Sequence, residues 1–132
     1  MKEKCGIRVL VVEDEQLIAL QMRMDLESAG YTVLEPVASG AQAIESVNTH
    51  RPDIVFLDIR LPGGMDGLEA ACTIRKTHSI PIVFLTGYVN PEISEHVRQI
   101  GSAIVLCKPV FIHQLESAIR AALEEKRDDF QH

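Results

Sequence analysis

The chain has few cysteines, few aromatic residues and no tryptophan. Its 132 residues include three cysteines, and none of them forms a CxxC pair with another. Widely spaced cysteines in an odd number do not predict a disulfide framework or a zinc site. We therefore expect a cytoplasmic protein that is held together by a packed core rather than by cross-links. The cysteines are Cys5, Cys72 and Cys107.

Long apolar runs and an excess of positive charge are also missing. No stretch approaches the ~20 apolar residues that span a bilayer, and the basic start, MKEK, turns acidic at Glu13 before a signal-like core is complete. The formal net charge of -6 argues against a general binder of nucleic acid or of membrane surfaces. Hydrophobic residues make up 46% of the chain, which is enough for one core.

Short runs rich in β-branched residues alternate with segments of helical periodicity. The expected strands cover residues 7–12, 32–38, 53–58, 80–86 and 103–108. Helices are expected at 15–29, from Ser39 through Val47, around 68–74, around 93–100 and from Phe111 through Leu123, with a solvated tail at 124–132. This alternation, with nearly continuous apolar strands, predicts an α/β domain with a parallel sheet and helices on both faces.

Polar residues stand at the C-terminal ends of four expected strands. In a parallel sheet these ends lie at one edge, where open α/β sheets bind their ligands. The strand at 32–38 contributes no such residue, and its Pro36 lacks an N–H, so we expect it at the edge of the sheet. The predicted strand order is 2-1-3-4-5. The polar residues are Glu13 and Asp14, Asp58, Thr86 and Lys108.

The three carboxylates in this group would repel one another unless a cation lay between them. Oxygen ligands suit Mg²⁺ or Mn²⁺, and no cluster of histidine and cysteine competes for a softer metal. One carboxylate would keep an oxygen free to attack phosphorus, as aspartate nucleophiles do. Lys108 could pair with the phosphoryl charge, and the Thr86 hydroxyl could donate to it.

Five motifs, in this order, resemble the receiver domain of two-component response regulators. They are VLVVEDE, PDIVFLDIRLP, MDGLEA, PIVFLTGY and CKPVF. The resemblance covers nearly the whole chain, and we expect a domain at 1–126 followed by a tail or the start of a linker at 127–132. It implies a doubly wound, flavodoxin-like fold and transfer of a phosphoryl group, with Mg²⁺, from a histidine kinase or a phosphotransfer protein.

The resemblance also assigns roles to individual residues. By the resemblance, Asp58 is the phospho-acceptor, and Thr86 and Lys108 contact the oxygens of the phosphoryl group. The metal ligands would be Asp14, Asp58 and the main-chain carbonyl of Arg60, with Glu13 acting largely through water. A cis bond is expected between Lys108 and Pro109, although only ~5–6% of X-Pro bonds in folded proteins are cis.

Two features depart from the family pattern. The position three residues before the lysine is often Tyr or Phe in the family and is Val105 here. An aromatic switch coupled to Thr86 is therefore absent or built differently. The loop LPGGMDG is one residue longer than the common loop, and its paired glycines are flexible. Tyr88, two residues after Thr86, is placed to contact a partner or to gate hydrolysis.

Each candidate residue also has an ordinary structural explanation. Acids such as Glu13 are favoured at helix N-termini by ~0.3–1 kcal/mol, and Lys108 could be a solvated surface residue. The expected function is a phosphorelay switch rather than a turnover enzyme. Two alternatives stay open, a receiver-like module that signals without phosphate and an aspartate-nucleophile phosphatase. The phosphatase commonly needs a second acid two residues after its nucleophile, where this chain has Arg60.

The expected output is a changed protein–protein surface after phosphorylation. The expected partners are a histidine kinase or phosphotransfer protein, and a downstream protein or an effector domain beyond this sequence. A homodimer is also open. We expect no direct contact with nucleic acid and none with a membrane.

Overall fold

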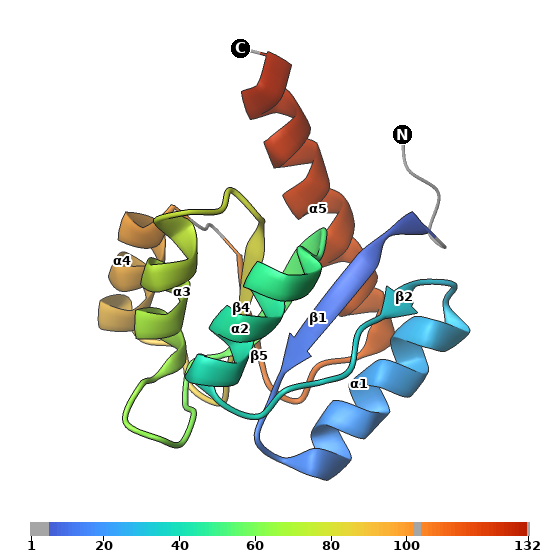
Figure 1. The fold of residues 1–132 in the computed structure, drawn as a ribbon, viewed down its shortest axis with the longest axis horizontal. Coiled ribbons are helices and arrows are strands. Elements are labelled where there is room, and N and C mark those ends of the chain that lie inside the picture. Colours follow the sequence, from blue (N-terminus) through green and yellow to red (C-terminus); the bar gives the residue numbers. More distant parts are fainter. Residues whose placement is uncertain (1–5, 102–103, 132) are drawn as a thin grey trace.

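The computed structural model describes residues 6–101 and 104–131, with side chains as far as Glu124. Strands and helices alternate along these residues (Figure 1). The strands are β1 (Arg8–Val12), β2 (Thr32–Val33), β3 (Ile54–Asp58), β4 (Ile82–Thr86) and β5 (Val105–Cys107). The helices are α1 (Gln16–Ser28), α2 (Gly40–His50), α3 (Gly67–Arg75), α4 (Pro91–Ile100) and α5 (Ile112–Gln131). The predicted alternation is confirmed.

The five strands form one parallel sheet in the order β2-β1-β3-β4-β5, as the sequence predicts. Helices α1 and α5 pack on one face, and α2, α3 and α4 pack on the other (Figure 1). Neighbouring residues of a strand alternate between the two cores. Val9 and Val11 belong to the core under α1 and α5, whereas Leu10 and Val12 belong to the other. A sheet covered in this way leaves its strand ends as the accessible edges.

The second strand is shorter than the sequence predicts. β2 covers two residues, and pairing with β1 resumes at a single bridge at Val37. Two hydrogen bonds frame the gap, Leu34 N to Val9 O at 2.9 Å and Val37 N to Val11 O at 3.1 Å. Three residues therefore advance along this segment while two advance along β1. The extra residue and Pro36, which has no N–H to donate, interrupt the ladder.

Side-chain caps fix the starts of three helices. Ser39 accepts a hydrogen bond from the backbone of α2, as predicted, and Asn90 caps α4 in the same way. Asp66 and Glu69 form a reciprocal capping box at the start of α3. The loop that begins after Asp58, the predicted acceptor, ends at this capping box. The box therefore fixes the C-terminal end of that loop.

The last helix is longer than expected. α5 continues to Gln131 through most of the segment that the sequence analysis treats as a tail. That segment, EEKRDDFQ, contains good helix formers and no Gly or Pro, so its charge does not end the helix. In β5, by contrast, the expected start at Ala103 lies outside the described residues.

Two further expectations concern cross-links and membranes. Cys72 and Cys107 carry free thiols, while Cys5 lies outside the described residues. Across the described ranges, no helix is both long enough and apolar enough to cross a bilayer.

Candidate functional site

Among the described residues, most of the buried polar and charged side chains lie at the C-terminal edge of the sheet. Four polar or charged residues are buried in the described chain, and three of them lie at this edge. These are Glu13, Asp58 and Thr86, which follow or end β1, β3 and β4 and are 2%, 4% and 3% exposed. Buried charge is costly unless it is paired. The edge therefore requires a cationic partner.

Three carboxylates meet at this edge, as predicted. One oxygen from each of Glu13, Asp14 and Asp58 lies within 4.8 Å of the other two. Glu13 and Asp58 are buried, while Asp14 is exposed and gives access from solvent. The second oxygen of Glu13, Oε2, is buried and has no hydrogen-bond partner. An oxygen-only donor set with an unsatisfied buried oxygen fits a hard divalent cation such as Mg²⁺ or Mn²⁺.

Lys108, directly after β5, neutralises part of this charge. Its Nζ lies 2.6 Å from Glu13 Oε1 and 2.6 Å from Asp58 Oδ2. Burial lowers the pKa of Lys108, but its hydrogen bonds to Asp58 and Glu13 outweigh this effect, and the net pKa is raised. The ammonium therefore stays charged. The bond from Lys108 to Pro109 is cis, as the resemblance implied.

Glu13 is the carboxyl group that burial perturbs. Burial first, and then the closeness of Asp58, raise the pKa of Glu13 from 4.5 to about 7, against the lowering effect of Lys108. Near neutral pH this acid is therefore partly protonated. A divalent cation would have to displace that proton, so cation binding and protonation of Glu13 compete.

Asp58 is held in place from two directions. Its Oδ1 accepts a hydrogen bond from the backbone N–H of Arg60 at 3.0 Å, and its Oδ2 accepts one from Lys108. Behind it, Gly67 donates to the carbonyl of Ile59 at 2.7 Å. A Cβ on Gly67 would lie 2.0 Å from the Asp58 carbonyl oxygen. Only glycine fits this turn. The Arg60 carbonyl stays a predicted metal ligand.

The Thr86 side chain lies at the same edge and bonds to its own loop. Its Oγ1 donates to the Tyr88 carbonyl at 3.0 Å and accepts from the Tyr88 N–H at 3.2 Å. The sequence analysis missed this contact. The residue type is a weak signal for it, because a threonine hydroxyl can hydrogen-bond to the backbone two residues further on.

The loop after β3 is docked against α2. Gly63 and Gly64 have positive φ values of 91° and 82°, which side-chain-bearing residues rarely adopt. A Cβ on Gly40 would lie 3.1 Å from Met65 Cγ, so Met65 covers the start of α2 closely. The sequence analysis noted the paired glycines but not this contact.

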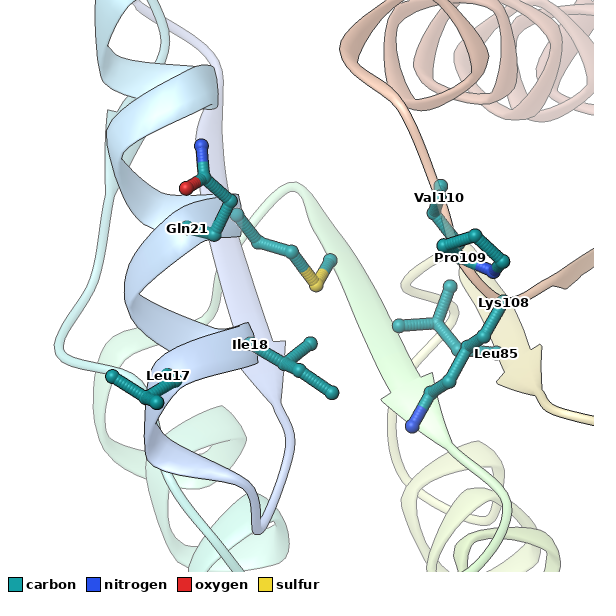
Figure 2. Close-up of a pocket in the computed structure, with 8 residues that line it drawn as sticks. Leu17, Ile18, Gln21, Leu85, Lys108, Pro109 and Val110 are labelled. Carbon is teal, nitrogen blue, oxygen red and sulfur yellow. The ribbon is translucent and has the colours of Figure 1, made fainter.

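An apolar pocket of about 250 Å³ adjoins Lys108 (Figure 2). Figure 2 shows Ile18 on α1 pointing across the opening toward Leu85 and Lys108, whereas the side chains of Leu17 and Gln21 point away from it. Leu17 is 82% exposed. The site is therefore bordered by accessible apolar surface on its α1 side. The lining residues are Leu17, Ile18, Gln21, Met22, Leu85, Lys108, Pro109 and Val110.

Known proteins with a similar sequence include regulators. The transcriptional regulatory protein PdtaR of Mycobacterium tuberculosis is 35% identical over 121 residues, which are 92% of this chain and 58% of the relative. The positive alginate biosynthesis regulatory protein of Pseudomonas aeruginosa is 36% identical over 124 residues, which cover 92% of this chain and 49% of that protein. The chain thus spans about half the length of these two relatives.

Solved structures with the same fold include receiver domains. The signal receiver domain of a modulated diguanylate cyclase from Desulfovibrio desulfuricans G20 matches with a TM-score of 0.85 and 34% identity, over 92% of this chain and 97% of that one. The chemotaxis protein CheY4 of Vibrio cholerae matches with a TM-score of 0.81 and 28% identity, over 88% and 98%. Residues 9–120 match the response regulator receiver domain family. The chain therefore belongs to the response regulator receiver domain family of two-component systems.

Proposed function

We propose that this domain accepts a phosphoryl group on Asp58 and thereby switches a protein–protein surface. The observation that carries the proposal is the arrangement around Asp58. One oxygen is bonded to the Arg60 amide, the other to Lys108, and two further carboxylates lie beside it. An acid so placed is oriented for attack, and it stands where a divalent ion would offset the charge of an incoming phosphate.

The transfer exchanges one bond to phosphorus for another. A carboxylate oxygen of Asp58 attacks the phosphorus of a phosphohistidine in line, the P–N bond breaks, and the electron pair returns to the imidazole nitrogen, which then takes a proton from solvent. Lys108 and the Thr86 hydroxyl stabilise the charge on the phosphoryl oxygens. A Mg²⁺ or Mn²⁺ ion held by Glu13, Asp14 and Asp58, together with the Arg60 carbonyl, would supply further positive charge.

The domain acts in this proposal as a switch in the cytoplasm rather than as a turnover enzyme. Its partners are a histidine kinase or phosphotransfer protein and a downstream protein or effector domain. We place the receiver unit at residues 1–126, with 127–132 as a tail or the start of a linker, although α5 itself continues to Gln131. An aspartate-nucleophile phosphatase would need an acid where Arg60 stands. A module that signals without phosphate would retain buried carboxylates at a cost in free energy without using them.

Labelling with a small phosphodonor tests the proposal. Acetyl phosphate with Mg²⁺ should add one phosphoryl group, detected by intact mass, and Asp58→Asn should abolish it. Asp66→Asn is the matched control, because Asn caps a helix as well as Asp does and Asp66 lies outside the carboxylate cluster. Equal labelling of Asp58→Asn and the wild type would contradict the proposal, as would labelling that persists unchanged when Mg²⁺ is chelated.

A further inference from the structure

A polar cleft of about 300 Å³ lies between α2 and the segment that follows β2. It shares no residue with the carboxylate cluster or with the apolar pocket beside Lys108. Its volume is at the lower end of the range of about 300–1,000 Å³ that is typical of ligand sites. The cleft therefore has room for a small molecule outside the site described above. Its lining includes Glu35, Val37, Gln42, Glu45, Ser46 and Thr49.

Ser46 is the buried polar residue of this cleft. It is 9% exposed, and its hydroxyl makes no hydrogen bond to any residue that the structure describes. A hydroxyl in a helix commonly bonds to the carbonyl four residues earlier, as Thr73 does to Glu69 at 3.1 Å. Ser46 instead lines the cleft with its donor and acceptor unsatisfied. Because buried polar groups are nearly always hydrogen-bonded, this hydroxyl indicates a polar occupant of the cleft.

The charge of the cleft favours a cation. Among the described residues, two carboxylates line it and no lysine or arginine does. Glu35 is already paired, with its Oε2 3.1 Å from Arg23 Nη1. Glu45, in contrast, forms no ion pair with any part of the described chain. Glu45 therefore leaves one uncompensated negative charge on α2, next to Ser46 in the sequence.

The other groups in the lining narrow the chemistry of the occupant. A carboxylate only accepts hydrogen bonds, the hydroxyls of Ser46 and Thr49 also accept them, and Val37 offers hydrocarbon surface. An alkylammonium ion has one positive charge, N–H donors and a carbon chain, so it matches all three features. A metal ion does not, because in the described ranges the only group of three His, Cys, Asp or Glu side chains close enough to share an ion lies at the sheet edge.

We infer that this cleft binds an alkylammonium group, with its charge beside Glu45, a hydrogen bond to Ser46 and its carbon chain against Val37. The inference is independent of the phosphorylation proposed for Asp58. A small amine and a lysine side chain of another protein both carry this group. Ion pairs at exposed carboxylates are weak in water, so we expect an affinity in the millimolar range and a selectivity that depends on the buried hydroxyl.

Titration of the nitrogen-15-labelled protein with butylamine tests the inference. The backbone amide resonances of Val37, Ser46 and Thr49 should shift and reach saturation. Butanol has the same carbon chain without the charge, and tetramethylammonium has the charge without an N–H donor, so both should bind several-fold more weakly. The amide of Nα-acetyl-lysine carries the same ammonium on a peptide unit. Tighter binding of this compound than of butylamine identifies a lysine side chain as the source, and weaker binding identifies a free amine.

Variants on α2 complete the test. Glu45→Gln and Ser46→Ala each remove one partner of the ammonium and should weaken butylamine binding by roughly 2- to 10-fold, as the loss of one hydrogen bond does. Glu124→Gln removes an exposed acid on α5, outside the cleft, and should bind as the wild type does. Butylamine that shifts none of the cleft amides, or binds no more tightly than butanol, overturns the inference. Equal affinities for Glu45→Gln and Glu124→Gln overturn it as well.

Discussion

Lys108 and Asp58 form an ion pair at the edge of the sheet, with Nζ 2.6 Å from Oδ2, although they lie 50 residues apart in the sequence. The same ammonium bonds to Glu13. One lysine therefore balances two buried carboxylates before a divalent cation or a phosphate adds to the site. This charge balance and the tight turn behind Asp58 both have measurable consequences.

Removal of the Lys108 charge should destabilise the metal-free domain. Lys108→Met leaves Glu13 and Asp58 without their shared donor, and an unsatisfied buried acceptor costs about 1–3 kcal/mol. Urea unfolding in EDTA at about pH 8, above the pKa of about 7 of Glu13, should show this loss, and added Mg²⁺ should restore part of it. Lys76→Met changes an exposed lysine and should be nearly neutral. Equal unfolding free energies for the two variants would contradict the charge balance.

Glu13 should make the stability of the metal-free domain fall as the pH rises. Its pKa is about 7 in the folded protein, above its ordinary value of 4.5. The folded state therefore binds the proton more tightly than the unfolded chain. The stability from this group is present below pH 4.5 and is lost as the pH rises to 7. Urea unfolding in EDTA across this window should show a shallower fall for Glu13→Gln, and an identical slope would contradict the raised pKa.

Asp14 should contribute to cation affinity more than to stability, because it is the exposed member of the carboxylate cluster. Asp14→Asn should weaken the affinity for Mn²⁺ by at least roughly 10-fold, the effect of losing a residue that only supports a metal ligand. Paramagnetic relaxation of water measures Mn²⁺ binding. Glu15→Gln is the matched control, since Glu15 lies next to Asp14 outside the cluster and makes no side-chain cap bond. Equal Mn²⁺ affinities for both variants would show that Asp14 is not a ligand of the cation.

Gly67 should be intolerant of any side chain. A Cβ there would overlap the Asp58 carbonyl, so Gly67→Ala must displace the backbone that carries the acceptor. Overpacking of this kind costs about 1–3 kcal/mol, and thermal or urea unfolding should register it. Gly87→Ala, where a Cβ meets nothing within 4 Å, should leave stability nearly unchanged. A stable Gly67→Ala variant would show that the turn has room to relax.

Sequence patterns were sufficient for the topology and for the residues that meet at the edge. Continuous apolar strands such as β3 predict a sheet covered on both faces, and parallel strands place their C-terminal residues together. The expected strand at 32–38 ends without a polar residue and contains Pro36, and both features predict its position at the edge of the sheet. These inferences succeed because they depend on periodicity and chain direction, which are properties of the sequence itself.

The details that sequence reasoning missed depend on contacts between distant segments. Nothing local to Met65 shows that it covers Gly40 on α2. β2 is short because the segment after it has one residue more than β1 between their shared hydrogen bonds. This mismatch is visible only when the two strands are aligned in the structure. The predicted end of α5 is wrong because the charged run after Leu123 indicates a solvated segment but also has the helix propensity to continue the helix to Gln131.

The most direct test of the central claim is to identify the residue that carries the phosphoryl group. Borohydride reduces an acyl phosphate on aspartate to homoserine, so treatment after incubation with acetyl phosphate and Mg²⁺ marks the acceptor for peptide mass spectrometry. We predict homoserine at position 58, and none when Mg²⁺ is chelated. Homoserine at Asp14 instead, or full incorporation without any at position 58, would contradict the account.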